Sequence, residues 1–515
     1  MAVPVERVVV PDAPRRAPAR RRTRRRRRRH PRRGPRRRRG LPARRRQRRP
    51  GRGRAGLRRS ARPRQRQRRR TAAAASRVGA LARDARPAAG PRRRRRRHRD
   101  GRRLGGRRRR RLAPHQRGHP VTDPRPPTTH RPFQHTPAGP SLYGPGVAAT
   151  IADKTLLKKA RNVVVVTDAG VRKAGLLEAI VAPFGVRVVH VEDGVVPDAD
   201  CDHVDATAAR ARELGCDAVL AVGGGSVMDT AKGVIAALAK GASIKSLEGV
   251  ATIRGKTLPL VCVPTTAGTG SEATQFAVLK DREERRKRIY VDASLVPALA
   301  VLDPTLLVGL PRAVTAATAV DTLTHAVEAI GSKLRNPMGS ALATEACRLL
   351  LVEQALSRSL LRPDDVEARG ACLIAAHLAG QAVSTAMLGA CHALAHAVGA
   401  HTGVPHGVAN GLFLVDVLRE NAAKAAPVYA TLARALGLGA ARDDDAALVA
   451  ALVAAIDEFV FDTAGLPRRL RDAAPALTEA DLPMLAAAAL ADPDLPTNPV
   501  ALDDAALHAI LRRRW

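Results

Sequence analysis

Cysteine is scarce in this chain, with six residues scattered over 515 positions and no CxxC pair. That usage argues against a disulfide framework and favours reduced, mostly buried thiols in a cytosolic protein. Long apolar runs are missing as well, since no stretch is both long enough and uncharged enough to span a bilayer. We therefore expect a cytoplasmic protein that does not partner a membrane.

After Met1, several residue types are missing from the first quarter of the chain. Between Met1 and Phe133 there is no further Phe, Tyr, Ile, Asn, Lys or Met. Without aromatic side chains this stretch lacks the stacking platforms with which single-strand binders hold bases. It also has no hydrophobic periodicity beyond a few Ala-rich residues and nothing that could form a core. We expect residues 1–135 to be a disordered Arg-rich extension.

The charge of this extension admits three interpretations. Residues 1–140 hold 53 Arg and no Lys against five acids, so they carry +48 and the remaining residues carry −4. An Arg-rich tail could bind RNA or DNA by neutralising phosphates. A targeting peptide fits less well, because there is no apolar segment and the run is too long. The interpretation we favour is a mis-assigned start codon in a G/C-rich genome, since the missing residues have A/T-rich codons. Nucleic acid is a partner only if the tail is real.

Residues 141–312 alternate strand-like and helix-like segments, which predicts a parallel α/β sheet. Val163 to Val166 form a continuous β-branched run, typical of a strand buried on both faces. The run ends at Asp168, an acid well placed to accept hydrogen bonds from an adenosine ribose and to repel a 2′-phosphate. An ordinary helix cap is the alternative for this residue.

Two small-residue loops follow the next two predicted strands. The segment 217–222 runs into Gly223, Gly224, Gly225 and Ser226, where glycines and a helix N-terminus suit a pyrophosphate. The segment 258–263 opens into a Gly-rich loop with Thr265, Thr266 and Thr269, whose small hydroxyl groups suit close contact with a phosphate, ribose or nicotinamide amide. A charged hairpin, DREERRKR, comes next, and from it Lys287 could reach a cofactor.

The rest of the chain, residues 313–515, is Ala/Leu-rich and predicted to be all α-helical, with helices at 337–358, 366–385, 408–421, 443–461 and 501–513. This part holds a histidine cluster. His392 and His396 are four residues apart and share a helix face, and His406 returns beyond a break at Gly403 and Pro405. Asp321 and His325 have the same one-turn spacing.

Two helices with this spacing can close one carboxylate and several imidazoles around a divalent metal. We predict Asp321, His325, His392 and His406 as the ligands, although any one of them alone would more simply be an ordinary core or surface histidine or acid. Cys391 is assigned to packing, because adjacent helix residues point about 100° apart. The donor set suits iron, zinc or manganese.

Four motifs together resemble the iron-containing (group III) alcohol dehydrogenase family: GGGSVMDTAKG, PTTAGTGSEAT, AVDTLTHAVEA and CHALAHAVGAHTGVPHGVANG. The resemblance runs from about residue 142 to Trp515, and SIKSLEGV and EERRKRIYVD resemble the lactaldehyde reductase (propanediol oxidoreductase) branch. It implies a Rossmann-like dinucleotide-binding lobe and a helical metal-binding lobe, the dehydroquinate synthase-like fold. It also implies Fe2+ and NAD as cofactors and a homodimer.

Matched position by position, the resemblance implies that the four predicted ligands bind the metal. It also implies that Asp168, Lys287 and the two loops bind NAD. His396 matches a histidine beside the metal and nicotinamide, and we expect it to relay a proton. His401 falls at a variable position and receives no role. The expected reaction interconverts a short alcohol and aldehyde, with lactaldehyde and 1,2-propanediol the best single guess. Ethanol, 1,3-propanediol, hydroxybutyrate and maleylacetate are the alternatives, and Asp321 argues against maleylacetate.

Overall fold

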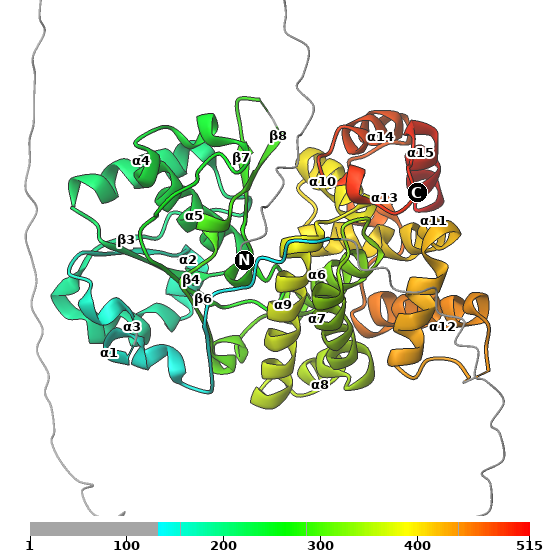
Figure 1. Ribbon diagram of the computed structural model, residues 1–515, viewed down its shortest axis with the longest axis horizontal. Coiled ribbons are helices and arrows are strands. Elements are labelled where there is room, and N and C mark those ends of the chain that lie inside the picture. The colour runs from blue at the N-terminus through cyan, green and yellow to red at the C-terminus, as the bar shows by residue number, and fades with distance from the viewer. Residues whose placement is uncertain (1–131, 155, 285, 441) are drawn as a thin grey trace, which may run out of the picture. The chain divides into compact units, whose positions relative to one another are not determined.

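The computed structural model describes residues 132–515 except 155, 285 and 441. Most of the predicted disordered extension, residues 1–135, lies outside the described residues. Its last four residues are described, and there His135 Nδ1 lies 3.3 Å from the Thr385 hydroxyl. Figure 1 shows two lobes in the described part: a sheet flanked by helices, and an array of helices beside it.

The first lobe is built on a six-stranded, all-parallel sheet with the order β1-β9-β6-β4-β2-β3. The predicted parallel α/β architecture is therefore confirmed. Helix α5 (Gly225–Lys240) follows β4, and helix α4 (Cys201–Glu213) packs against it. The strands span Ser141–Tyr143 (β1), Val163–Val166 (β2), Val188–Glu192 (β3), Ala218–Gly223 (β4), Leu260–Pro264 (β6) and Leu299–Leu302 (β9).

Successive side chains of the central strands point to opposite faces of the sheet. Both faces are buried, so these strands are apolar throughout. In β4, residues 218, 220 and 222 enter the core on one face of the sheet, and residues 219 and 221 enter the core on the other. Strand β6 divides its residues between the same two cores. Because both faces are covered, no position on these strands is left for a polar side chain.

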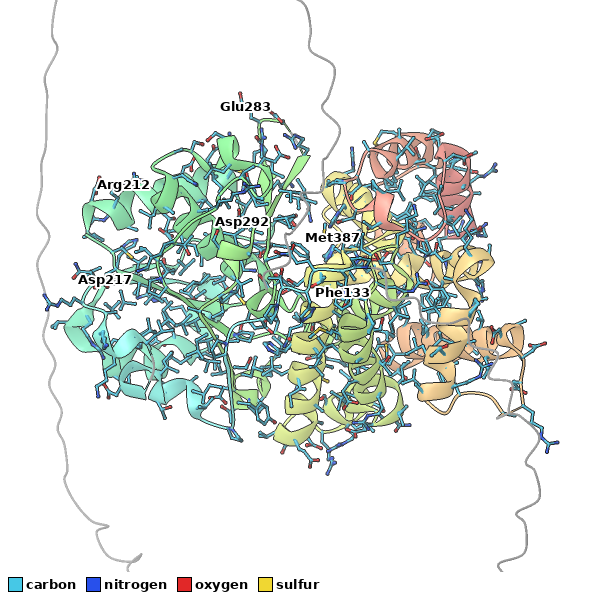
Figure 2. All side chains as sticks on the ribbon, viewed as in Figure 1. Phe133, Arg212, Asp217, Glu283, Asp292 and Met387 are labelled. Carbon is cyan, nitrogen blue, oxygen red and sulfur yellow. The ribbon has the colours of Figure 1, made fainter. Side chains whose placement is uncertain are left out.

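A charged hairpin stands beside the main sheet. Strands β7 (Phe276–Asp281) and β8 (Arg286–Val291) pair antiparallel, and the short β5 (Gly249–Val250) adds to β8 in parallel. The exposed Glu283 lies near the tip of this hairpin, as labelled in Figure 2. Buried Arg288 is held there by ion pairs to Asp281, Glu248 and Glu284.

The second lobe is helical from α6 onward and encloses one large apolar core. Its long helices are α6 (Arg312–Gly331), α7 (Pro337–Cys347), α9 (Val366–Ala386), α10 (Ala390–Thr402), α11 (His406–Ala435), α12 (Asp445–Asp457), α14 (Leu482–Leu490) and α15 (Asp504–Arg513). Met387, labelled in Figure 2, forms the turn between α9 and α10 with a φ of 61°.

Two predicted helices have different bounds in the structure. The segment 337–358 is not one helix, because Gln354 adopts a left-handed φ of 53° and separates α7 with its π-helical extension from α8 (Ala355–Leu361). The helix predicted at 408–421 instead runs through Pro427 to residue 435. Burial of Tyr429 and Leu432 beyond the proline stabilises this continuation, which outweighs the hydrogen bond that proline cannot make.

None of the individual helices in the described part of the chain combines the length and apolar content needed to cross a bilayer. Helices α9 and α10 would do so only as a pair, and that pair is bent by 104°.

Candidate metal centre and cofactor loops

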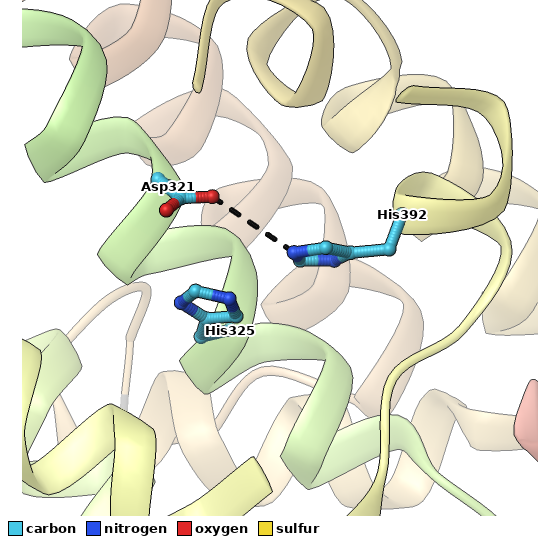
Figure 3. A group of neighbouring side chains, drawn as sticks. All are labelled: Asp321, His325 and His392. Carbon is cyan, nitrogen blue, oxygen red and sulfur yellow. Dashed lines mark ion pairs between the residues drawn. The ribbon is translucent and has the colours of Figure 1, made fainter. Parts of the chain in front are cut away.

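Side chains from three helices converge in the second lobe. Helix α6 carries Asp321 and His325, and α10 carries His392; Figure 3 shows these three pointing toward one another. Their ligand atoms all lie within 4.8 Å of one another. His406 joins from the first turn of α11, with Nε2 3.5 Å from Asp321 Oδ1. A left-handed Gly403, with a φ of 73°, ends α10 and allows this third helix to enter.

Asn410 lies at the centre of the group. Its Nδ2 donates to Asp321 Oδ1 at 2.8 Å and lies 3.2 Å from His392 Nε2 and 3.3 Å from His406 Nε2. An amide has only two N–H bonds for these three acceptors, so one lone pair is left unsatisfied. His325 Nδ1 is also buried without a hydrogen-bond partner among the described residues. One carboxylate and several imidazoles with unmet lone pairs fit a bound divalent metal.

Glu328, one turn of α6 beyond His325, orients His392. Its Oε2 lies 2.5 Å from His392 Nδ1, and its Oε1 accepts a hydrogen bond from the Cys391 backbone N–H at 2.8 Å. A carboxylate on Nδ1 leaves Nε2 as the atom that faces the metal position. Gly389 permits this contact, because a Cβ there would come within 3.0 Å of Glu328 Oε1. The Cys391 thiol donates to the Asn410 carbonyl oxygen at 3.2 Å, in agreement with a packing role.

Burial and neighbouring charges set the protonation of the imidazoles. Burial lowers the pKa of His325, and burial together with the Lys287 charge holds the pKa of His406 well below its usual range. Burial also acts to lower the pKa of His392, but the charge and hydrogen bond of Glu328 outweigh it and the pKa is raised. Neutral His325 and His406 have the lone pairs that a metal ligand requires.

His396 stands next to this group and belongs to a second one. Its ring is stacked on that of His406, with centroids 5.3 Å apart. Its Nδ1 lies 2.9 Å from Asp492 Oδ2 and 3.8 Å from Asp494 Oδ2. Both carboxylates come from the turn after α14, about a hundred residues along the chain.

The two predicted cofactor loops meet at the carboxyl ends of β4 and β6. A Cβ at Gly224 would come within 3.2 Å of Thr266 Oγ1, and one at Gly225 within 2.6 Å of Thr269 Cγ2. The Thr265 N–H donates to the Gly223 carbonyl oxygen at 3.0 Å. Helix α5 begins here without a side-chain cap, which leaves its first N–H groups available to a phosphate.

Buried Lys232 ties the threonine loop to α5. Its Nζ donates to the carbonyl oxygens of Ser271, Thr274 and Phe276 and to the Thr274 hydroxyl, at distances between 2.7 and 3.0 Å. The same loop reaches the metal group, because the Thr322 hydroxyl beside Asp321 lies 3.2 Å from the Gly268 carbonyl oxygen. The cofactor loops and the candidate metal ligands are therefore neighbours.

Asp168 and Lys287 have partners of their own. Asp168 is the N-cap of α2 (Ala169–Lys173), where Oδ1 accepts from the Val171 N–H at 2.9 Å. Its second carboxylate oxygen accepts no hydrogen bond from the residues that the structure describes. It follows β2, the neighbour of β4, so it lies at the same edge of the sheet as the glycine loop. Lys287 on β8 forms an ion pair with Asp198 at 3.2 Å.

Five residues that contact the candidate ligands or the loops were not predicted from the sequence: Glu328, Asn410, Lys232, Asp492 and Asp494. Glu328 and Asn410 could have been predicted, since each lies three or four residues from a predicted ligand on the same helix face. Asp492 and Asp494 could not, because their contact with His396 depends on how α14 packs against α10.

Two family models match this chain. One, described as iron-containing alcohol dehydrogenase, covers residues 140–304, and the other, the C-terminal domain of the Fe-containing alcohol dehydrogenase family, covers residues 315–515. The 1,3-propanediol dehydrogenase of Klebsiella pneumoniae is 33% identical over 392 residues, which are 75% of this chain and 100% of that protein.

Solved structures agree with these matches. The crystal structure of a 1,3-propanediol oxidoreductase has a TM-score of 0.71 and 32% identity, over 75% of this chain and 100% of its own. A sulfoacetaldehyde reductase from Bifidobacterium kashiwanohense, solved in complex with NAD+, has a TM-score of 0.67 and 28% identity, over 75% of this chain and 99% of its own.

Proposed function

Because this chain belongs to the iron-containing alcohol dehydrogenase family, whose members use NAD and iron, we propose that it interconverts a short-chain alcohol and its aldehyde. Lactaldehyde and 1,2-propanediol are the substrate pair we propose first. The Klebsiella relative makes 1,3-propanediol the second. The observation that carries the proposal is the convergence of Asp321, His325, His392 and His406 beside the threonine loop.

These four residues are proposed to hold the metal, with Glu328 and Asn410 fixing their orientation. When bound, the metal supplies Lewis-acid polarisation of the alcohol or carbonyl oxygen, and the nicotinamide supplies or accepts the hydride. One carboxylate and three neutral imidazoles leave a net positive charge on a divalent ion.

The cofactor is proposed to lie along the carboxyl ends of β2, β4 and β6. Gly223, Gly224, Gly225 and Ser226 would receive the pyrophosphate at the α5 N-terminus, and Thr265, Thr266 and Thr269 the nicotinamide half. Asp168 would bind the adenosine ribose through the oxygen that its cap leaves free. Lys287 on β8 would also contact the cofactor, and its charge, together with burial, lowers the pKa of His406.

His396 is the proposed proton-transfer residue. Asp492 engages its Nδ1 at 2.9 Å, so Nε2 is the nitrogen left to exchange a proton with the substrate hydroxyl.

Three organisational features belong to the same proposal. Residues 141–312 would form the NAD-binding domain and 313–515 the catalytic domain. A homodimer would form through the sheet lobe, where β1 is an edge strand and Tyr143 is 48% exposed. Six unpaired cysteines support a cytoplasmic location.

The test is a metal analysis of anaerobically purified protein together with an NAD-linked panel of short alcohols. His392→Ala and His406→Ala should each remove most of the bound metal and lower turnover by several orders of magnitude. His401→Ala is the matched control, because His401 is exposed on the same helix α10 and, among the described residues, its Nδ1 contacts only the Ala397 carbonyl oxygen. Full metal occupancy and near-normal turnover in both ligand variants would contradict the assignment of His392 and His406 as metal ligands.

A further inference from the structure

A buried hydrogen-bonded pair joins the threonine loop, residues 264–274, to the helical lobe. Glu272 of this loop is 2% exposed, and its Oε1 accepts a hydrogen bond from His377 Nδ1 on α9 at 3.1 Å. Among the described residues, Glu272 forms no ion pair with a lysine or arginine. The other ring nitrogen, His377 Nε2, lies 2.9 Å from the Ser141 hydroxyl on β1. The histidine therefore contacts the loop on one side and the edge strand of the sheet on the other.

The loop residues on both sides of Glu272 are held by the other lobe. The Ser271 hydroxyl donates to Asp229 Oδ1 on α5 at 2.7 Å. Lys232 Nζ, also on α5, donates to the Thr274 carbonyl oxygen at 3.0 Å and to its hydroxyl at 2.9 Å. Burial lowers the pKa of Lys232, and the charges of Asp229 and Glu272 act against this effect. One short loop is thus anchored to α5 in the first lobe and to α9 in the second.

The contact between Glu272 and His377 fixes the register of the loop on α9. Beside it, Gly270 packs against the backbone of α9, and the Gln275 N–H donates to Ser384 Oγ at 3.2 Å. Apolar contacts tolerate a small slide of one surface over another. A buried carboxylate does not, because it is stable only where it meets its donor.

We propose that Glu272 and His377 are positioning residues, which hold the threonine loop where hydride transfer requires it. The inference rests on the proposed function, in which Thr265, Thr266 and Thr269 receive the nicotinamide half of NAD. Both residues act through the loop, and neither is proposed to touch the substrate or the metal.

A displaced loop would leave the metal ligands in place. The loop meets the metal group where the Gly268 carbonyl oxygen lies 3.2 Å from the Thr322 hydroxyl, and it supplies none of the candidate ligands. A shift of the loop would therefore move the nicotinamide relative to the substrate. Misplacement by about 1 Å can slow a chemical step by about 100-fold. The expected signature is slow hydride transfer with normal metal binding.

The first variants break the contact in the metal-loaded, full-length enzyme. Glu272→Met keeps the length of the side chain and removes the acceptor. We expect the single-turnover rate constant of NADH formation to fall by about 10- to 100-fold. The dissociation constant of NADH, measured by fluorescence, should rise, and metal affinity, measured by chelator titration, should not change. A misfolded fraction would lower only the amplitude of the single turnover.

Two further variants at this site serve as controls. Glu272→Gln should recover most of the lost rate, because its amide oxygen still accepts from His377 Nδ1. Ser141→Ala removes only the contact on the other ring nitrogen, so the rate constant should match that of the wild type.

A double variant separates positioning from folding. Glu272→Met combined with His377→Leu replaces the buried pair with apolar side chains, a change that often costs no stability. We expect this protein to melt close to the wild-type temperature and still to transfer hydride slowly.

Three results would overturn the proposal. The first is an unchanged rate constant in Glu272→Met. The second is a double variant with the wild-type rate constant, which would assign the pair to stability alone. The third is loss of bound metal in Glu272→Met, which would assign the pair to support of the metal site. Failure of the proposed function looks different, since the wild type itself would then form no NADH with any alcohol of the panel.

Discussion

At the scale of single residues, the chemistry depends on side chains that hold the candidate ligands. Glu328 contacts both His392 Nδ1 and the N–H of Cys391, so it fixes the ring and the start of α10 together. Its carboxylate packs tightly against Gly389, since a Cβ there would come within 3.0 Å of Oε1.

We expect Glu328→Gln to weaken metal binding by about 10- to 100-fold. Glutamine keeps a polar contact with His392 but removes the charge that raises the pKa of this imidazole. Titration of the loaded protein with a competing chelator measures the change without relying on activity. Glu367→Gln, at an exposed position on α9, should leave metal affinity unaltered, and equal affinities in the two variants would contradict the orienting role.

Asp168 combines two roles that substitution can separate. Asp168→Asn keeps an N-cap for α2 and removes the charge, so it should shift the preference toward NADP(H) by about 1–3 kcal/mol with little loss of stability. Asp168→Gly should also admit NADP(H). Steady-state kinetics with both cofactors measures the ratio, and Asp444→Asn at the cap of α12 is the control. A wild type that already uses both cofactors equally would make Asp168 a cap and nothing more.

At the scale of elements, one close approach joins the threonine loop to the helical lobe. Gly270, with a φ of 59°, packs against α9 so tightly that a Cβ would come within 2.5 Å of the Ala376 carbonyl oxygen. Gly380 on α9 faces it, and a Cβ there would come within 2.5 Å of the Gly270 carbonyl oxygen. Two glycines therefore set how near the threonine loop lies to the candidate metal ligands.

Gly380→Ala should push the loop away from α9. We expect a loss of about 1–3 kcal/mol in the free energy of unfolding, from overpacking against backbone, together with a raised KM for NAD. Gly399→Ala is the matched helical control, because its Cβ would meet only the Val404 carbonyl oxygen at an ordinary 3.5 Å. Urea denaturation of both variants checks this, and a Gly380→Ala protein as stable as the control would refute the close contact.

At the scale of the whole molecule, the described enzyme occupies the last three quarters of the chain. The family matches begin at residue 140, and 75% of this chain covers the whole of the 1,3-propanediol oxidoreductase structure. The contacts of His135 and Thr136 with Thr385 mark the first described attachment to the helical lobe.

Deletion of residues 1–130 keeps these contacts and should leave melting temperature and kcat/KM unchanged. The removed segment carries some 50 arginines and has no apolar face, and salt at about 0.15 M screens diffuse attraction to the body beyond roughly 8 Å. Thermal melting, kinetics and retention on nucleic acid, measured with and without the segment, test this. A lowered melting temperature would mean that the segment packs on the enzyme.

The sequence by itself determined the features that repeat over short distances. Continuous apolar runs predicted β2, β4 and β6, glycines placed the turn before α5, and one-turn spacing put Asp321 with His325 and His392 with His396. Each of these depends on residues within a few positions of one another, where backbone geometry alone fixes which side chains share a face.

Only the tertiary structure decided which faces meet. It brought Glu328 to His392 across 64 residues and Asp492 to His396 across 96, and it carried α11 through Pro427 by burying the helix beyond. These outcomes depend on how α6, α10, α11 and α14 pack, and packing contacts between distant segments have no period that one sequence can reveal.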